Sequence, residues 1–141
     1  MPRADFYLIT KPRFLAEPLR LVCELARRAH DSGQPTLILV RDASQADELD
    51  ELLWAFDEEA YLPHQIAGQD EDDEITPVLI VAPDVDTPDR PLVINLRDEV
   101  APGRYERVLE VVPADAQARE PLRQRWSQYK GMGFALAKHD M

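Results

Sequence analysis

The stretch "TLILV" at residues 36–40 decides the fold, because it is a continuous apolar run of strand length. A strand without polar alternation is typical of a parallel sheet whose two faces are both covered. "VLIVA" (78–82) and "LVINL" (92–96) have the same character. The aromatic and β-branched stretch "ADFYLIT" (4–10) predicts a first strand. Together these runs predict a mainly parallel sheet.

Apolar residues recur at helical spacing between these strands. The first such pattern predicts a helix over about 14–31, with Pro18 tolerable only in its first turn and Gly33 as its stop signal. Ser44 and Asp47 predict the start of the next helix, as a variant of the capping box.

Two further segments complete the pattern. "YERVLEVVP" (105–113) predicts a short helix that gives way to a strand, and a last helix is expected from about 116 to 131. Strands that alternate with helices indicate an α/β fold. We find no internal repeat and no long linker, so one domain over residues 1–141 is expected.

The chain is strongly acidic, with 16 Lys and Arg, 27 Asp and Glu, and a net charge of −11. Phosphate backbones repel such a chain at long range, which disfavours generic nucleic-acid binding. The acids at 70–74 lack the spacing and the glycine of an EF-hand, so we expect a solvated loop there. No run has the length of a membrane helix, and the opening residues lack the apolar segment of a signal peptide. The single cysteine, Cys23, excludes an internal disulfide and indicates a reducing cytoplasm.

Catalytic patterns are missing from the sequence. The five glycines form neither a dinucleotide-binding nor a P-loop pattern, and there is no nucleophile elbow. His30 is expected at a helix end, Cys23 in the core, and His139 at a frayed terminus. We therefore expect a protein that is not an enzyme and that holds no cofactor or metal.

One face of the last helix combines cations with an aromatic ring. Arg119, Arg123, Trp126 and Lys130 follow the spacing i, i+4, i+7 and i+11, and Tyr129 lies on a neighbouring arc that can serve the core. Two interpretations stay open. Trp126 can pack partly into the core of an ordinary surface helix, or the stripe can bind an acidic partner that carries an aromatic or aliphatic anchor.

A second candidate surface lies at "LWAFDEEAYLPHQ" (53–65), where aromatic and apolar residues crowd a helix end and a loop. Trp54 and Tyr61 are the expected anchors of a protein–protein contact. The alternative is that Phe56 and Leu62 simply pack into the core.

Several of these segments together resemble the chi subunits of bacterial DNA polymerase III. They are "FYLI", "LVCELA", "ELDELLWAF", "LPHQIAG", "INLR", "EVVP" and "RQRWSQYKGMGF". The resemblance implies a Rossmann-like three-layer α/β fold and no catalytic activity. It also implies a bacterial cytoplasmic location at the replisome, with DNA contacted only indirectly and no membrane contact.

The resemblance further implies partners and residues. Chi subunits link the clamp-loader complex, through its psi subunit, to the acidic C-terminal tail of single-stranded DNA-binding protein, which ends in Pro-Phe. By position, the residues implied for tail binding are Arg119, Arg123, Trp126, Tyr129 and Lys130. Ser127 stands where the family often has lysine.

The residues implied for the psi-facing surface are Trp54, Tyr61, Leu62, Pro63 and His64. A repair helicase is an alternative partner at that surface. Two other functions remain as rivals: a small α/β enzyme acting on a nucleotide or phosphorylated metabolite, and a direct single-stranded DNA binder that stacks bases on Trp126.

Overall fold

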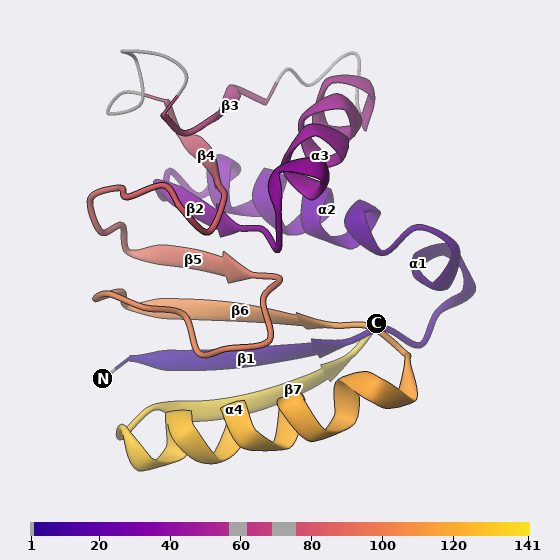
Figure 1. Cartoon of the computed structure of the whole chain (residues 1–141), viewed down its shortest axis with the longest axis vertical. Helices are drawn as coiled ribbons and strands as arrows, with labels where there is room; N and C mark the ends of the chain where they lie inside the picture. Colours follow the sequence, from indigo (N-terminus) through magenta and orange to yellow (C-terminus); the bar gives the residue numbers. More distant parts are fainter. Residues whose placement is uncertain (1, 57–61, 69–75) are drawn as a thin grey trace.

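The computed structural model describes residues 2–56, 62–68 and 76–141. They form a seven-stranded sheet in the order β3-β4-β2-β5-β6-β1-β7, and all neighbouring strands are parallel (Figure 1). The strands are β1 (Arg3–Leu8), β2 (Thr36–Leu39), β3 (His64–Ile66), β4 (Val78–Val81), β5 (Leu92–Asn95), β6 (Arg107–Val112) and β7 (Ala135–Asp140). The predicted α/β fold with a parallel sheet is confirmed.

Helices cover both faces of this sheet. They are α1 (Pro12–Ala16), α2 (Pro18–Asp31), α3 (Ala43–Phe56) and α4 (Arg119–Gly131), with the 3₁₀ turn η2 (Ala116–Ala118) before α4. The helices α1, α2 and α3 pack on one face, while α4 packs on the other, against β1 and β7 (Figure 1). The result is three layers with one hydrophobic core on each side of the sheet.

The predicted helix over 14–31 is in fact two helices. The ring of Pro18 disfavours helical backbone at the preceding residue, and Glu17 accordingly has φ −136° and ψ 81°. Pro18 occupies the first turn of α2, as predicted, and Gly33 follows the helix with φ +74°. The break turns Leu15 outward and leaves Phe14 in the core.

The start of α3 was predicted at the wrong residue. Asp42 caps the helix, since its Oδ1 accepts a hydrogen bond from the Gln45 backbone N–H at 2.7 Å. The Gln45 side chain in turn accepts from the Arg41 N–H at 2.8 Å. The pair resembles a capping box shifted two residues toward the N-terminus from Ser44.

Three other segments differ from prediction. The segment 105–113 contains no helix and holds only the strand β6. The strand β3 lies in a region predicted as loop, and β7 forms where a frayed terminus was expected. His139 is therefore ordered in β7, where it stacks on Tyr7 and contacts an Asp5 carboxylate oxygen at 3.0 Å. The acids at 70–74 lie outside the described residues.

Candidate functional site

A groove between α4 and the sheet is the main candidate site. It has a volume of about 480 Å³ and is lined by Phe6 and Leu8 of β1, Leu122, Arg123, Trp126 and Ser127 of α4, and Lys138 of β7. Successive residues of a strand point to opposite faces, and this places Phe6 and Leu8 together on the α4 side of β1. The Trp126 ring packs on the Phe6 ring with centroids 5.1 Å apart. The groove therefore has an apolar floor that the core itself holds in place.

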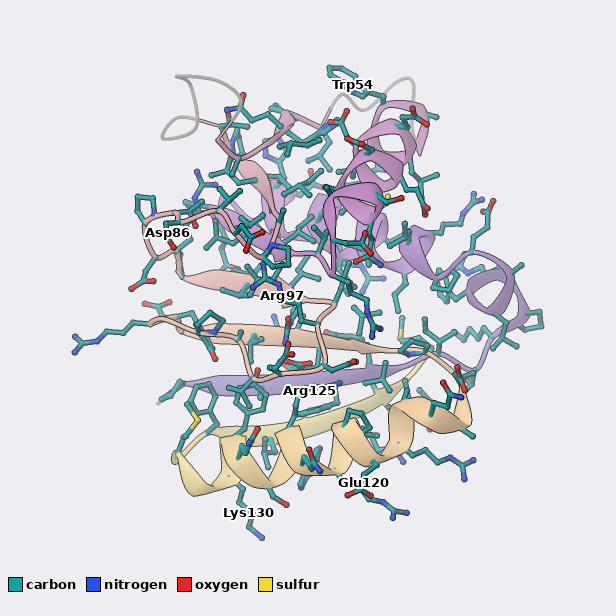
Figure 2. All side chains as sticks on the ribbon, in the orientation of Figure 1. Trp54, Asp86, Arg97, Glu120, Arg125 and Lys130 are labelled. Atoms are coloured by element: carbon teal, nitrogen blue, oxygen red, sulfur yellow. The ribbon has the colours of Figure 1, made fainter. Side chains whose placement is uncertain are left out.

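Cations surround this floor. Arg123 lines the groove, and Arg119 precedes it by about one turn on the same helix face. Neither guanidinium has an ion pair or hydrogen bond among the residues that the structure describes. Lys130 continues the stripe but does not line the groove. Figure 2 shows both Lys130 and Glu120 on the side of α4 that is turned away from the sheet. Of the three cations in the predicted stripe, Arg123 lines the groove, while Arg119 and Lys130 lie outside its lining.

Tyr129 is not a surface residue. Its side chain is fully buried, and its hydroxyl donates to Glu110 Oε2 at 2.6 Å and accepts from the Ala101 N–H at 3.1 Å. Burial and the neighbouring carboxylate raise the pKa of this phenol. The placement of Tyr129 among the tail-contacting residues is therefore corrected, whereas the prediction that its arc of the helix serves the core is confirmed.

The sequence analysis missed the buried group that anchors α4. Arg125 is 4% exposed, and its Nε donates to Glu110 Oε1 at 2.8 Å while its Nη1 donates to the Asp98 carbonyl at 2.9 Å. Asn95 also donates to Glu110, at 2.7 Å. Burial raises the pKa of Glu110, and Arg125, Tyr129 and Asn95 act against that rise. This network connects α4 to β5 and β6 and so sets where Arg123 and Trp126 lie.

The second predicted surface is only partly on the outside. Trp54 is 54% exposed, and its ring leans on the His64 ring with centroids 4.7 Å apart. Leu62 and His64 are buried, and Pro63 is half-buried. The prediction that Leu62 and His64 contact a partner is thus corrected, because both side chains are buried and can only support the surface from within. Tyr61 lies outside the described residues.

Hydrogen bonds fix the support beneath Trp54. His64 Nδ1 lies 2.7 Å from the Leu62 carbonyl, and His64 Nε2 lies 3.2 Å from an Asp50 carboxylate oxygen. Asp50 and Trp54 are four residues apart on α3 and share a face of the helix. The exposed indole of Trp54 therefore packs on a buried histidine whose two ring nitrogens both have partners.

The carboxyl ends of the central strands, where open α/β sheets bind their ligands, are occupied by the protein's own groups. Arg97 Nε donates to the Val40 carbonyl at 2.9 Å, and its Nη2 donates to the Val81 carbonyl at 3.0 Å. Arg41, beside it, pairs with Asp98 at 2.7 Å. The cavity at this edge is about 200 Å³, which is below the roughly 300 Å³ typical of ligand pockets.

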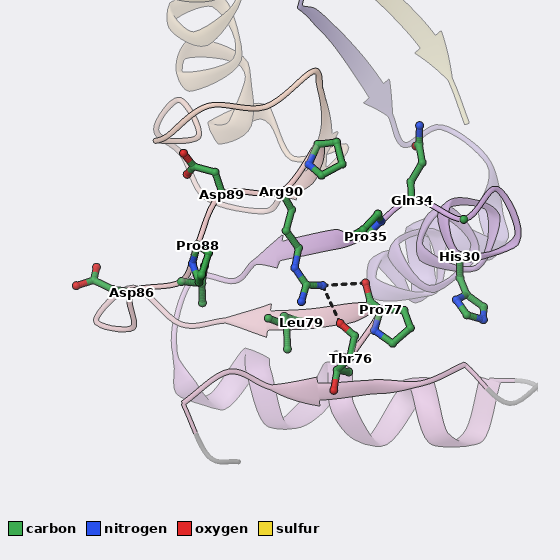
Figure 3. Close-up of a pocket in the computed structure, with 13 residues that line it drawn as sticks. His30, Gln34, Pro35, Thr76, Pro77, Leu79, Asp86, Pro88, Asp89 and Arg90 are labelled. Carbon is green, nitrogen blue, oxygen red and sulfur yellow. Dashed lines mark hydrogen bonds between the residues drawn. The ribbon is translucent and has the colours of Figure 1, made fainter. Parts of the chain in front are cut away.

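A cavity of about 650 Å³ lies at the opposite edge, near the start of β2 and β4 (Figure 3). Arg90 spans it and donates to the carbonyls of Thr76 at 2.8 Å and Pro77 at 3.0 Å. Figure 3 shows Asp86 and Asp89 turned away from that guanidinium. The basic group is thus engaged with backbone, and the cavity offers no arrangement typical of phosphate binding or catalysis among the residues drawn.

Other candidate groups are structural. Cys23 is fully buried, and burial raises the pKa of its thiol to about 12. Within residues 2–56, 62–68 and 76–141, no cluster of three His, Cys, Asp or Glu side chains could hold a metal ion. Over the same residues, no helix is long and apolar enough to span a membrane.

Comparison with known proteins gives the family. A sequence profile described as "DNA polymerase III chi subunit, HolC" matches residues 1–137. The DNA polymerase III subunit chi of Pseudomonas aeruginosa is 34% identical over 99% of this chain and 96% of its own length. The corresponding Escherichia coli protein is 34% identical over 96% of each chain.

Solved structures with a similar fold are more distant in sequence. Dbp5 of S. cerevisiae has a TM-score of 0.60 at 16% identity, and a DEAD box protein of Methanococcus jannaschii has a TM-score of 0.58 at 12% identity. The similarity covers 97% and 98% of this chain but 41% of each of those chains, and it bears on the Rossmann-like fold alone. The profile and the full-length relatives establish more, and the chain belongs to the family of DNA polymerase III chi subunits.

Proposed function

We propose that this chain is a non-catalytic adaptor of DNA replication. In this proposal the groove beside α4 holds the acidic C-terminal tail of single-stranded DNA-binding protein, and the surface around Trp54 binds the psi subunit of the clamp-loader complex. The observation that carries the proposal is the groove itself, where an apolar floor adjoins Arg123 and Lys138, which have no acidic partner among the described residues.

The groove suits a chain terminus with an aromatic side chain. Its volume of about 480 Å³ falls within the range of roughly 300–1,000 Å³ typical of small-ligand sites. The terminal phenylalanine of a Pro-Phe tail would pack on the partly exposed Trp126 and Leu122, while the fully buried Phe6 supports the Trp126 ring. The terminal carboxylate would meet Arg123 in a charge-assisted hydrogen bond. Acidic residues earlier in the tail would approach Arg119. Lys130 adds positive charge to α4 without a place in the groove.

The rival functions have less support. A nucleotide-dependent enzyme would need an open carboxyl edge of the sheet, and Arg97 fills that edge. A direct DNA binder would have to attract phosphates, and the net charge of −11 on this chain repels them at long range.

Titration of a fluorescent acidic peptide ending in Pro-Phe tests the proposal. We expect a dissociation constant in the micromolar range, because burial of one aromatic ring contributes only about 2–3 kcal/mol and ordering costs offset much of it. Arg123→Ala and Trp126→Ala should each weaken binding at least tenfold, whereas Gln124→Ala, on an exposed position of the same helix, should not. Wild-type affinity of Trp126→Ala would refute the site. Tight binding of an oligonucleotide that the peptide does not displace would favour the DNA-binding rival instead.

The second surface is tested separately. Trp54→Ala should abolish capture of the psi subunit in a pulldown and leave the peptide affinity unchanged, because Trp54 is on α3, across the sheet from α4. Capture of a repair helicase by the wild type, lost in the same variant, would show that the helicase uses this surface. Joint loss of both activities in a folded Trp54→Ala variant would contradict the assignment of two independent surfaces.

A further inference from the structure

The strand β7 brings a cation to the groove from the sheet side. Its residues alternate, so that Lys138 pairs with Phe6 of β1 and shares the face that looks toward α4, while His139 pairs with Tyr7 on the other face. Lys138 is the β7 residue that lines the groove. No helical spacing connects it with Arg123, and the two meet only because β7 lies beside β1.

The Lys138 ammonium is exposed, and it has no hydrogen bond or ion pair among the residues that the structure describes. Most other cations near the sheet are engaged, as Arg107 is with Asp5 at 2.7 Å and Arg125 is with Glu110. On the helix side, the groove residue after Trp126 is the neutral Ser127. The groove therefore has two cations, Arg123 on its helix wall and Lys138 on its sheet wall.

We propose that Lys138 and Arg123 together hold the α-carboxylate of the ligand's last residue, and that Lys138 makes the groove selective for a free chain terminus. The inference rests on the proposed function and adds a residue and a specificity to it. A carboxylate has two oxygens that can accept hydrogen bonds from different sides, which suits one donor on each wall. The terminal side chain then lies on the apolar floor between the two cations.

An amidated or internal aromatic residue would have the same ring and lack this charge. The groove would then leave its second cation without an acceptor. Because Lys138 is exposed, its contribution is that of a solvent-accessible charge pair, and we expect a loss of about three- to fivefold in affinity when it is neutralised.

The experiment uses two peptides of the same acidic sequence ending in Pro-Phe, one with a free carboxylate and one with a C-terminal amide. They are titrated into the full chain and its Lys138→Met, Lys138→Arg and Lys130→Met variants. Lys138→Met should bind the free-acid peptide about three- to fivefold more weakly than the wild type, and the amidated peptide less than twofold more weakly, as for any lost surface charge. Lys138→Arg should retain the preference for the free acid, and Lys130→Met, which removes the same charge outside the groove, should lower both affinities equally and by less than twofold.

The outcomes separate this inference from the proposed function. If the wild type binds the free-acid peptide and Trp126→Ala does not, the proposed site stands. In that case, equal losses for the two peptides in Lys138→Met, or no loss at all, would overturn the role of Lys138. If the wild type binds neither peptide, the proposed function fails and this inference fails with it. Thermal melting of each variant confirms that an exposed side chain was removed without unfolding the protein.

Discussion

Replacement of Arg125 by methionine tests whether the buried network holds α4. Methionine keeps most of the side-chain volume and removes the charge. Arg125 is 4% exposed and Glu110 is fully buried, so the variant leaves a carboxylate inside the protein with only the neutral donors Tyr129 and Asn95. The hydrogen bond from Arg125 to the Asp98 carbonyl is lost as well.

The size of the effect follows from this burial. Breaking a buried ion pair by removing one partner costs about 3–5 kcal/mol. For a domain of this length, that corresponds to a fall in melting temperature of roughly 10–15 °C. Urea unfolding followed by circular dichroism at pH 7 measures the free energy of unfolding directly.

The variant should also acquire a characteristic pH dependence. Burial already raises the pKa of Glu110 in the wild type, and loss of Arg125, which acts against that rise, should raise it further above the value of about 4.3 in the unfolded chain. A raised pKa in the folded state means that the contribution to stability is full below that unfolded value and is lost as pH rises through the folded one. The loss of stability relative to the wild type should therefore grow as pH rises above the pKa of Glu110 in the wild type, which itself lies above its ordinary value.

A second substitution separates charge from volume. Glu110→Gln combined with Arg125→Met removes the stranded charge, so the double variant should be more stable than Arg125→Met alone at pH 7. A cost below about 1 kcal/mol for Arg125→Met, or no rescue by Glu110→Gln, would refute the view that this pair anchors the helix.

Three further predictions concern single residues away from the groove. Cys23, with its pKa raised to about 12 and no exposure, should resist a thiol reagent at pH 8 in the folded protein and react once urea unfolds it. Gly103→Ala and Gly33→Ala should each lower the free energy of unfolding by roughly 1–2 kcal/mol, because both glycines have positive φ, and the exposed Asp89 carboxylate can move away from a Cβ added at Gly103. Burial raises the pKa of Asp5, but its charged partners outweigh that effect and hold the pKa below 3.8. The free energy of unfolding should therefore fall as pH drops below about 4. Asp5→Asn should make this acid-side fall less steep.

The central strands were predictable because burial leaves a strong local signature. A strand covered on both faces is mostly apolar and lacks the alternation of a half-exposed strand, and the runs at 36–40, 78–82 and 92–96 contain β2, β4 and β5 with one extra residue each. The edge strands lack that signature. β3 has three residues, and β7, "ALAKHD", has one face partly open to solvent, so its pattern resembles a polar terminus.

The segment 105–113 was misread for a physical reason that bears on the site. Glu110 interrupts an apolar run, and a charge inside such a run favours the helical interpretation. The carboxylate is tolerated in a buried strand because Arg125 reaches it from α4, fifteen residues later. Local spacing could predict which residues share a face of α4, but not what that face lies against, because the neighbours Phe6 and Lys138 come from opposite ends of the chain.

The strand order has a consequence for how the protein is made. The first strand pairs only with late ones, since Arg3 lies opposite Arg107 in β6 and opposite Ala135 in β7. At a synthesis rate of about 5–20 residues per second, β1 emerges from the ribosome several seconds before either partner exists. The aromatic side chains of Phe6 and Tyr7, which are buried in the folded protein, lack their partner strands during that interval. Such an apolar segment is a natural target for a chaperone. The groove needs Lys138 of β7 as well as Phe6 of β1, so it can form only after β7 has paired with β1.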